Sequence, residues 1–260
     1  MSANPQPKRE LVVDNLKVKV YSTRSEMGAA AAYAVADAMR RFINSKGSCA
    51  MVFAAAPSQN EFLETLGSIP GLDWSKVIAF HMDEYIGLPE TAPQRFSTYL
   101  REHIFDRVKP GTVYYIDGNA KDVEKECERY SELLRKHPLD VGCLGIGENG
   151  HIAFNDPPVA DFNDPKLMKV VELEERCRLQ QVHDGCFATL KDVPTKALTL
   201  TVPALMSAKE IYCIVPGPTK SIAVKRTLEG PISTECPATI MRRHSNATLF
   251  LDEVAAELVR

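Results

Sequence analysis

Short apolar segments alternate with helical patterns along most of the chain, and this alternation limits the fold more than any other feature. The segments are nearly continuous in apolar residues, which is typical of strands buried on both faces of a sheet. They are Cys49–Ala55, Val77–Met82, Val113–Ile116, Asp140–Ile146 and Ile211–Val215. Such strand–helix–strand units predict an α/β fold with a mainly parallel sheet flanked by helices and joined by right-handed crossovers.

The intervals between these strands contain helical patterns. They cover Ser25–Ile43, Glu61–Gly67, Phe96–Val108, Val123–Lys136 and Lys220–Leu228. For the first of them we expect Ser25 as the N-cap and Gly47 as the stop. Alternating polar and apolar residues predict further strands at Leu16–Ser22, Ala197–Val202 and Ala247–Leu251.

The absence of a fixed-period repeat or a clear linker favours a single domain. We predict a disordered tail over residues 1–10 and one α/β domain over residues 11–260, which is long enough to bury a full core without disulfides or metals. The least regular stretch is Asn155–Val171, which contains three prolines. It is the best candidate for a mobile segment.

Composition excludes several classes of protein. A net charge of -3 argues against a protein that binds nucleic acid by bulk phosphate neutralisation. No segment is apolar enough to span a membrane, and the first ten residues lack the apolar stretch of a secretory signal. The seven cysteines are an odd number without a C-x-x-C pair, which is typical of reduced thiols. We therefore predict a cytoplasmic protein that binds neither membranes nor nucleic acid.

Two adjacent carboxylates, Asp83 and Glu84, lie at the end of the expected strand Val77–Met82. In open parallel sheets, ligands bind at the carboxyl ends of the strands. Burial and a neighbouring negative charge both raise a carboxylate pKa, which suits such a group to general-base catalysis. The alternative is a helix cap with a surface ion pair.

A glycine-rich turn follows the strand expected at Asp140–Ile146 and contains His151. Its glycines match G-x-G-x-x-G, but a dinucleotide site needs a helix directly afterwards, and Pro157-Pro158 prevents one. Gly147 and Gly150 instead predict a tight turn that presents the imidazole to a ligand. Asn149 and Asp156 flank the histidine and can fix its tautomer. A purely structural histidine is the alternative.

A third strand end leads through Pro216-Gly217-Pro218 to Lys220. Free N–H groups of the first helical turn, together with this lysine, predict an anion site. An ordinary helix start with a solvated lysine is the alternative. The chain's histidines lack the helical i, i+4 spacing or cysteine neighbours of zinc sites, so no metal is predicted.

At these segments the chain resembles the glucosamine-6-phosphate deaminase/isomerase family. The matching pieces are Met82–Tyr85, Gly147–Asn155, Val193–Thr199, Lys220 and Glu229-Gly230, in family order. The resemblance implies a Rossmann-like α/β domain that converts an amino-sugar phosphate to a keto-sugar phosphate and ammonia without a cofactor. The 6-phosphogluconolactonases share the fold but carry a different turn.

The resemblance also implies roles for individual residues. Asp83 is the base that moves a proton between C1 and C2, with Glu84 beside it in the site, and His151 assists ring opening. Asn149 and Asp156 hold the imidazole, and Asn155–Val171 corresponds to the family's lid. The implied substrate-binding residues are Ala55, Ala56, Ser58, Gly147, Gly150 and Lys220.

This sequence departs from the family pattern in the turn and at the phosphate end. Asn149 stands where many members have Asp, and Asp156 stands where Glu is usual. The loop Ala54–Gln59 lacks the family's glycines, and the family's phosphate-binding arginine has no clear equivalent. We expect Arg176 or Arg178 to replace it.

Three alternatives to a glucosamine-6-phosphate deaminase stay open at this point. The altered Ala54–Gln59 loop is compatible with a different sugar substrate or with a lactonase. A non-catalytic domain that senses sugar phosphate is the third. Family members range from monomers to hexamers, so the resemblance leaves the oligomeric state open, a homo-oligomer included.

Overall fold

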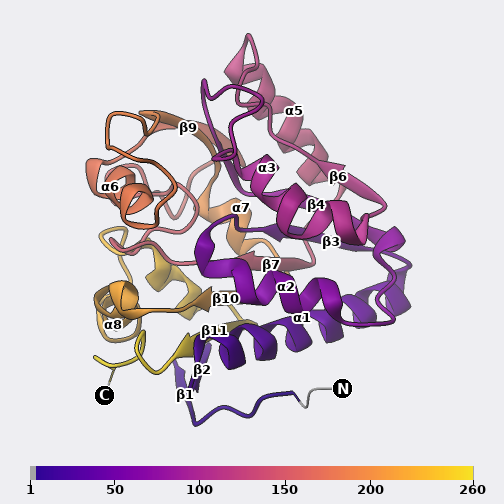
Figure 1. The fold of residues 1–260 in the computed structure, drawn as a ribbon, viewed down its shortest axis with the longest axis vertical. Helices are drawn as coiled ribbons and strands as arrows, with labels where there is room; N and C mark the ends of the chain where they lie inside the picture. The colour runs from indigo at the N-terminus through magenta and orange to yellow at the C-terminus, as the bar shows by residue number, and fades with distance from the viewer. Residues whose placement is uncertain (1–3, 260) are drawn as a thin grey trace.

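The structure, a computed structural model, describes residues 4–259 and is built around a main sheet of eight strands (Figure 1). Their order across the sheet is β1-β2-β11-β10-β7-β3-β4-β6, and every pairing is parallel except that of β1 with β2. The strands are β1 (Arg9–Val13), β2 (Leu16–Tyr21), β3 (Cys49–Phe53), β4 (Val77–His81), β6 (Thr112–Tyr114), β7 (Val141–Leu144), β10 (Glu210–Val215) and β11 (Ala247–Asp252). The predicted α/β class and mainly parallel sheet are confirmed.

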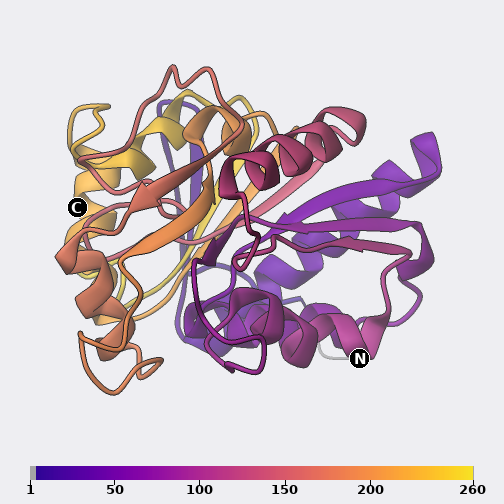
Figure 2. The ribbon, with the colours of Figure 1, turned by 90° about the horizontal axis from the view of Figure 1, so that it is seen from above.

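Helices cover both faces of this sheet, as the view from above shows (Figure 2). One face packs on α1 (Arg24–Lys46), α2 (Asn60–Ser68) and α3 (Phe96–Leu100), and the other on α5 (Val123–Lys136), α7 (Val202–Met206) and α8 (Ser221–Glu229). A π-helical turn, Arg101–Phe105, joins α3 to α4 (Asp106–Val108), so the helix predicted over Phe96–Val108 is present but wider and underwound in the middle. The remaining helix is α6 (Glu175–His183).

Strands in the middle of the sheet form where continuous apolar runs allow burial on both faces. All five residues of β3 are buried, and neighbouring β7 is buried throughout. Burying one such aliphatic side chain stabilises the fold by about 1.5–3 kcal/mol. The strand predictions from apolar runs are therefore confirmed, with ends that differ by up to two residues.

The start of α1 differs from the prediction. Its N-cap is Thr23 rather than Ser25, and Thr23 and Glu26 form a reciprocal capping box in which each side chain accepts from the other's backbone N–H. Ser25 lies inside the first turn. The pattern Thr-x-x-Glu satisfies two free N–H groups where a serine alone satisfies one, and this decides the boundary. Gly47 ends the helix with φ of 83°, as expected.

A smaller antiparallel sheet was not predicted. It consists of β5 (Asp83–Tyr85), β9 (Lys196–Leu200) and β8 (Met168–Glu172), in that order. The strand expected at Ala197–Val202 is therefore present as β9, but outside the main sheet. In Figure 1 the part of the chain with α6 and β9 lies at the upper left of the main sheet. Only Met82 separates β4 from β5, so Asp83 lies where the chain passes from one sheet to the other.

The N-terminal boundary also differs from the prediction. β1 starts at Arg9 and pairs with β2, inside the segment expected to be a tail, while residues 1–3 lie outside the described residues. β8 likewise starts within the stretch expected to be irregular. None of the helices within residues 4–259 has both the length and the apolar character needed to cross a membrane.

Candidate active site

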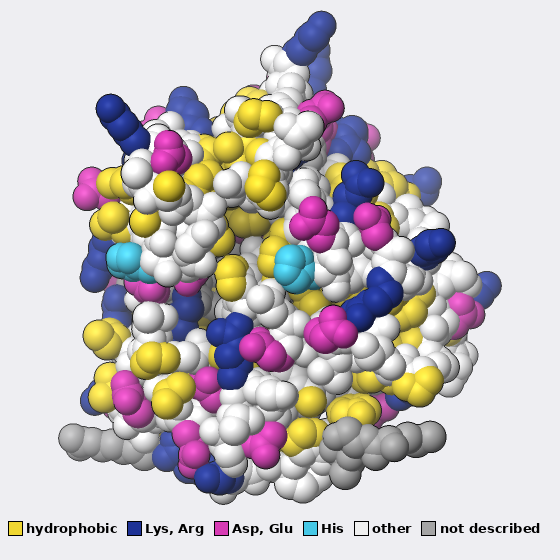
Figure 3. All heavy atoms as spheres, in the orientation of Figure 1, with side chains coloured by type: hydrophobic (Ala, Val, Ile, Leu, Met, Phe, Trp, Pro, Cys, Tyr) yellow, Lys and Arg dark blue, Asp and Glu magenta, His cyan; other side chains and the backbone are white. Residues whose placement is uncertain are grey.

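An open hollow lies at the carboxyl ends of β3, β4, β7 and β10, the edge at which parallel sheets bind ligands. It brings together most of the predicted site residues, which come from four separate parts of the chain: Ala55, Ala56, Ser58, Asp83, Gly147, His151 and Lys220. On the face shown in Figure 3, Lys and Arg side chains are interspersed with Asp and Glu. This face therefore shows no extended basic patch of the kind that binds nucleic acid.

Asp83 supplies a buried carboxylate to the pocket. Its side chain is 7% exposed, and no side chain or backbone N–H among residues 4–259 donates a hydrogen bond to it. Burial, and secondarily the charge of Glu84, raises the pKa of Asp83 well above its usual value. A carboxylate of raised pKa that faces a pocket without a partner is suited to accept a proton from a ligand.

Glu84 has a different role from its neighbour. Its carboxylate accepts hydrogen bonds from Phe96 N, Ser97 N and Ser97 Oγ at 2.8–3.0 Å, and so caps the first turn of α3. It is fully buried and does not line the pocket. Side chains alternate across a strand, so adjacent residues of β5 point to opposite sides. Each of the two alternatives for this carboxylate pair therefore describes one residue: Asp83 lines the pocket, and Glu84 caps a helix.

His81 holds the backbone at the start of β5. Its Nε2 accepts from Ile116 N at 2.9 Å, and its Nδ1 lies 2.9 Å from Asp83 O. One ring nitrogen therefore accepts and the other donates, which defines a neutral imidazole with the proton on Nδ1. Burial lowers the pKa of His81, in agreement with that neutral state. His81 therefore fixes the backbone position of Asp83 and does not line the pocket.

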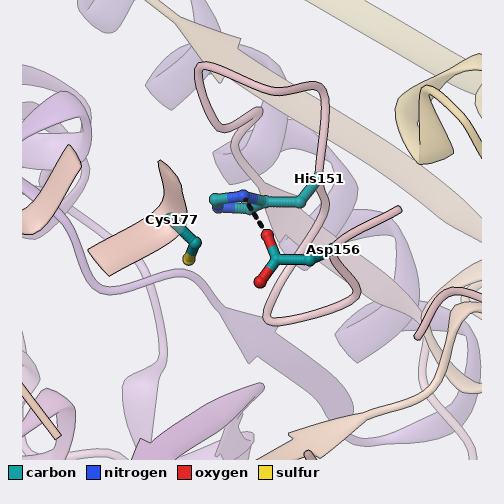
Figure 4. Close-up of side chains that lie close together, drawn as sticks. All are labelled: His151, Asp156 and Cys177. Atoms are coloured by element: carbon teal, nitrogen blue, oxygen red, sulfur yellow. Dashed lines mark ion pairs between the residues drawn. The ribbon is translucent and has the colours of Figure 1, made fainter. Parts of the chain in front are cut away.

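His151 lies beside the carboxylate of Asp156 (Figure 4), and it is held by the amide of Asn149, whose own orientation is fixed. Asn149 Nδ2 donates to Asp156 Oδ1 at 2.9 Å and to Glu174 Oε2 at 2.8 Å, so Asn149 Oδ1 must face the histidine. His151 Nδ1 then lies 2.7 Å from Asn149 Oδ1 and 2.9 Å from Asp156 Oδ1. Both neighbours are acceptors, so Nδ1 carries the proton and Nε2 keeps its lone pair.

Asp156 balances opposing influences on its charge. Burial by itself raises the pKa of Asp156, but the charge of His151 and hydrogen bonds from His151, Asn149 and the backbone of Glu174 outweigh it, and the net pKa is below the usual value. The carboxylate is 1% exposed. It therefore stays ionised and can stabilise an imidazolium.

The glycines of the turn allow close packing on the imidazole. A side chain at Gly147 would overlap the ring of His151, so only glycine leaves the ring in place. Gly150 has φ of 93° and lies against Cys236, away from the pocket lining. Its function is in the turn, and the prediction that it binds substrate is not supported by its position. No helix starts in this turn, in agreement with the rejection of a dinucleotide site.

Lys220 is a buried cation without a partner. It is 5% exposed, and among residues 4–259 no carboxylate lies within ion-pairing distance of its Nζ. Burial lowers the pKa of Lys220, and the more distant charges of Asp184 and Glu148 counteract that only in part. The alternative of a solvated lysine is therefore wrong. A desolvated ammonium facing a pocket calls for an anionic ligand.

The replacement arginines expected from the sequence do not reach this end of the pocket. Arg178 donates to Leu190 O and Val193 O, and neither it nor Arg176 lines the pocket. The side chains present instead are amides: Gln59, Gln180 and Gln181. Sequence analysis missed the last two, and Glu174 with them, because α6 has weak helical periodicity and was not predicted.

Comparisons with known proteins agree with this geometry. Residues 22–250 match the family model described as glucosamine-6-phosphate isomerases/6-phosphogluconolactonase. Glucosamine-6-phosphate deaminase of Bacillus cereus (strain B4264) is 40% identical over 187 residues, which are 72% of this chain and 70% of that protein. The corresponding protein of Bacillus thuringiensis (strain Al Hakam) has the same identity and coverage.

Solved structures give the same comparison in three dimensions. A monomeric glucosamine-6-phosphate deaminase superposes with a TM-score of 0.85 at 32% identity, covering 93% of this chain and 99% of that one. A 6-phosphogluconolactonase from Thermotoga maritima superposes with a TM-score of 0.75 at 20% identity, covering 91% and 99%. The second match is evidence for the fold alone.

Proposed function

Because this chain belongs to the family of glucosamine-6-phosphate isomerases and 6-phosphogluconolactonases, we propose that it converts glucosamine 6-phosphate and water to fructose 6-phosphate and ammonia. The observation that carries the proposal is the meeting of Asp83, His151 and Lys220 in one pocket. The reaction needs an acid/base group to open the sugar ring, a proton acceptor to act on the open chain, and a cation to bind the phosphate. We also propose that the reaction takes place in the cytoplasm, since all seven cysteines are free thiols.

His151 opens the sugar ring in this proposal. Its Nε2 lone pair takes the proton of the C1 hydroxyl while the bond between C1 and the ring oxygen breaks, and Nε2 then passes that proton to the ring oxygen. The resulting imidazolium is stabilised by Asp156, and Asn149 keeps Nδ1–H in position. The tautomer fixed by Asn149 supports this assignment, because an acceptor at Nε2 is what ring opening requires.

Asp83 carries the proton transfer between carbons. Its ionised carboxylate removes the C2 proton, which is acidified by the neighbouring C1 aldehyde, and returns a proton to C1. The product is an imine at C2, and addition of water there releases ammonia and leaves the ketone. The raised pKa of Asp83 brings it closer to the neutral working range, which favours both halves of the transfer.

The decisive experiment is the release of ammonia by the purified protein from glucosamine 6-phosphate, with glucosamine and 6-phosphogluconolactone as parallel substrates. We expect ammonia from the first only. Ammonia release from glucosamine at a similar rate would show that the substrate is an unphosphorylated sugar. Hydrolysis of the lactone would show that the protein is a lactonase. Binding of the sugar phosphate, seen as a rise in melting temperature without turnover, would assign a sensing domain.

Lys220 is expected to hold the substrate phosphate, together with Ser58 and backbone N–H groups near Ala55 and Ala56. Lys220→Gln should raise KM about 10–100-fold with a smaller change in kcat, because a charge-assisted contact contributes about 1.5–3 kcal/mol. The matched control is Lys225→Gln in α8, the helix that follows Lys220, because Lys225 is partly exposed and paired with Glu229. Steady-state kinetics that show equal KM for both variants would remove Lys220 from the phosphate site.

A further inference from the structure

We propose that His151, Asp156 and Cys177 form a binding site for a zinc-class divalent cation beside the pocket, and that the ion inhibits the enzyme. The imidazole, carboxylate and thiol offer one ligand atom each, and these atoms lie within 4.8 Å of one another. Figure 4 shows the three side chains converging from the glycine-rich turn, the segment after it and α6. The inhibition rests on the proposed function, whereas the binding does not.

The ligand set matches the preference of zinc. Nitrogen, sulfur and carboxylate oxygen bind Zn²⁺ at about 2.0–2.3 Å in a tetrahedron, which places ligand atoms about 3.5 Å apart. The present atoms need to close by about 1 Å, a distance within reach of side-chain rotation. His151 Nδ1 and Asp156 Oδ1, now hydrogen-bonded at 2.9 Å, have to separate to the tetrahedral spacing when the ion replaces the proton between them. The fourth position is left for water.

Charge also favours the complex. Burial raises the pKa of the Cys177 thiol, but once the thiolate forms, it and the Asp156 carboxylate balance the two charges of the ion, so the metal-bound cluster is neutral. The proposed reaction gives Cys177 no task, although it is 1% exposed and lies beside two groups that the reaction does use. Of the three residues, His151 lines the pocket, so the cluster lies directly behind the pocket wall.

Inhibition follows from the proton balance. Nδ1 of the free imidazole carries the proton, so coordination at Nδ1 requires that proton to move to Nε2. The thiol releases its own proton to solvent, and one proton leaves for each ion bound. Nε2 then carries a hydrogen and has no lone pair for the C1 hydroxyl. The ion thus removes the acceptor that ring opening needs, without occupying the Lys220 end of the pocket.

Binding is tested with metal ions alone. Cobalt(II) titrated into the purified protein is expected to give a thiolate-to-cobalt charge-transfer band at one ion per chain, and zinc should displace it. Cys177→Ala and Cys177→Ser should abolish the band and weaken zinc binding at least about tenfold. Cys186→Ala, which removes the one cysteine of residues 4–259 that is not fully buried, should change neither. A band that survives in both Cys177 variants, or its absence from the wild type, overturns the site.

Activity gives the second arm. Micromolar zinc is expected to inhibit ammonia release by the wild type, with recovery on adding a chelator. Cys177→Ala should keep its turnover without metal and lose most of the sensitivity to zinc. Equal zinc sensitivity of wild type and variant would refute the inhibitory role. If no ammonia is released at all, the proposed function fails, and the cobalt spectra still decide whether the metal site exists.

Discussion

Asp83→Asn is expected to lower ammonia release from glucosamine 6-phosphate by about 10²–10⁴-fold, the usual contribution of a positioned general base. The amide keeps the shape of the carboxylate but cannot take the C2 proton. Because Lys220 and His151 are untouched, KM should change little. The measurement is steady-state kinetics on both proteins, and retention of more than a tenth of kcat by the variant would remove Asp83 as the base.

The same substitution should not cost stability at neutral and alkaline pH. The pKa of Asp83 is raised in the folded protein, so the folded state holds a proton that the unfolded state has lost. The free energy of unfolding therefore falls as pH rises from the ordinary carboxylate pKa of about 3.9 through the raised value. Asp83→Asn has no such charge to bury. Its melting temperature should equal or exceed that of the wild type above this window, which separates loss of chemistry from loss of fold.

Ionisation of Asp83 also controls how activity depends on pH, and its effect on activity is opposite to its effect on stability. Only the ionised carboxylate accepts the C2 proton, so kcat/KM of the wild type should fall as pH drops through the raised pKa of Asp83. Activity and stability thus change in opposite directions across this pH range. A base that is costly to bury in its working form is a feature of many catalytic sites.

The main sheet could be predicted because its central strands are buried on both faces and carry a strong local signal. The small sheet could not, because β5 has only three residues and follows β4 after Met82 alone. Its partner β9 is more than a hundred residues away in sequence, and no local pattern identifies that pairing. The first turn of α1 is a different case. Thr23 and Glu26 are visible in the sequence as a capping box, and the choice of Ser25 overlooked the second residue of that motif.

The site could be predicted where it depends on strand ends, and not where it depends on α6. Asp83, His151 and Lys220 each follow a strand of the main sheet, and the parallel arrangement brings these ends together. Glu84 has the same sequence signal as Asp83, and only the alternation of side chains along β5 separates their roles. Glu174, the residue just before α6, contacts Asn149 across 25 residues of sequence, and no sequence pattern indicates this contact.

His151→Gln is expected to lower kcat about 10²-fold or more and to leave KM within a few-fold of the wild type. Glutamine has no group that accepts and returns a proton near neutral pH. The residual rate should approach that set by spontaneous opening of the sugar ring. The matched control is His137→Gln, at the C-terminal end of α5, which should leave kcat unchanged.

An open-chain inhibitor distinguishes loss of ring opening from damage to the pocket. An amino-sugar alcohol 6-phosphate has no ring to open and still presents the phosphate to Lys220. His151→Gln should therefore bind it about as tightly as the wild type, measured by competition or calorimetry. If the variant loses both turnover and this binding, the imidazole shapes the pocket and does not open the ring. If it keeps the binding and loses turnover, the loss is in chemistry at C1, which Nε2 reaches only because Asn149 and Asp156 hold the proton on Nδ1.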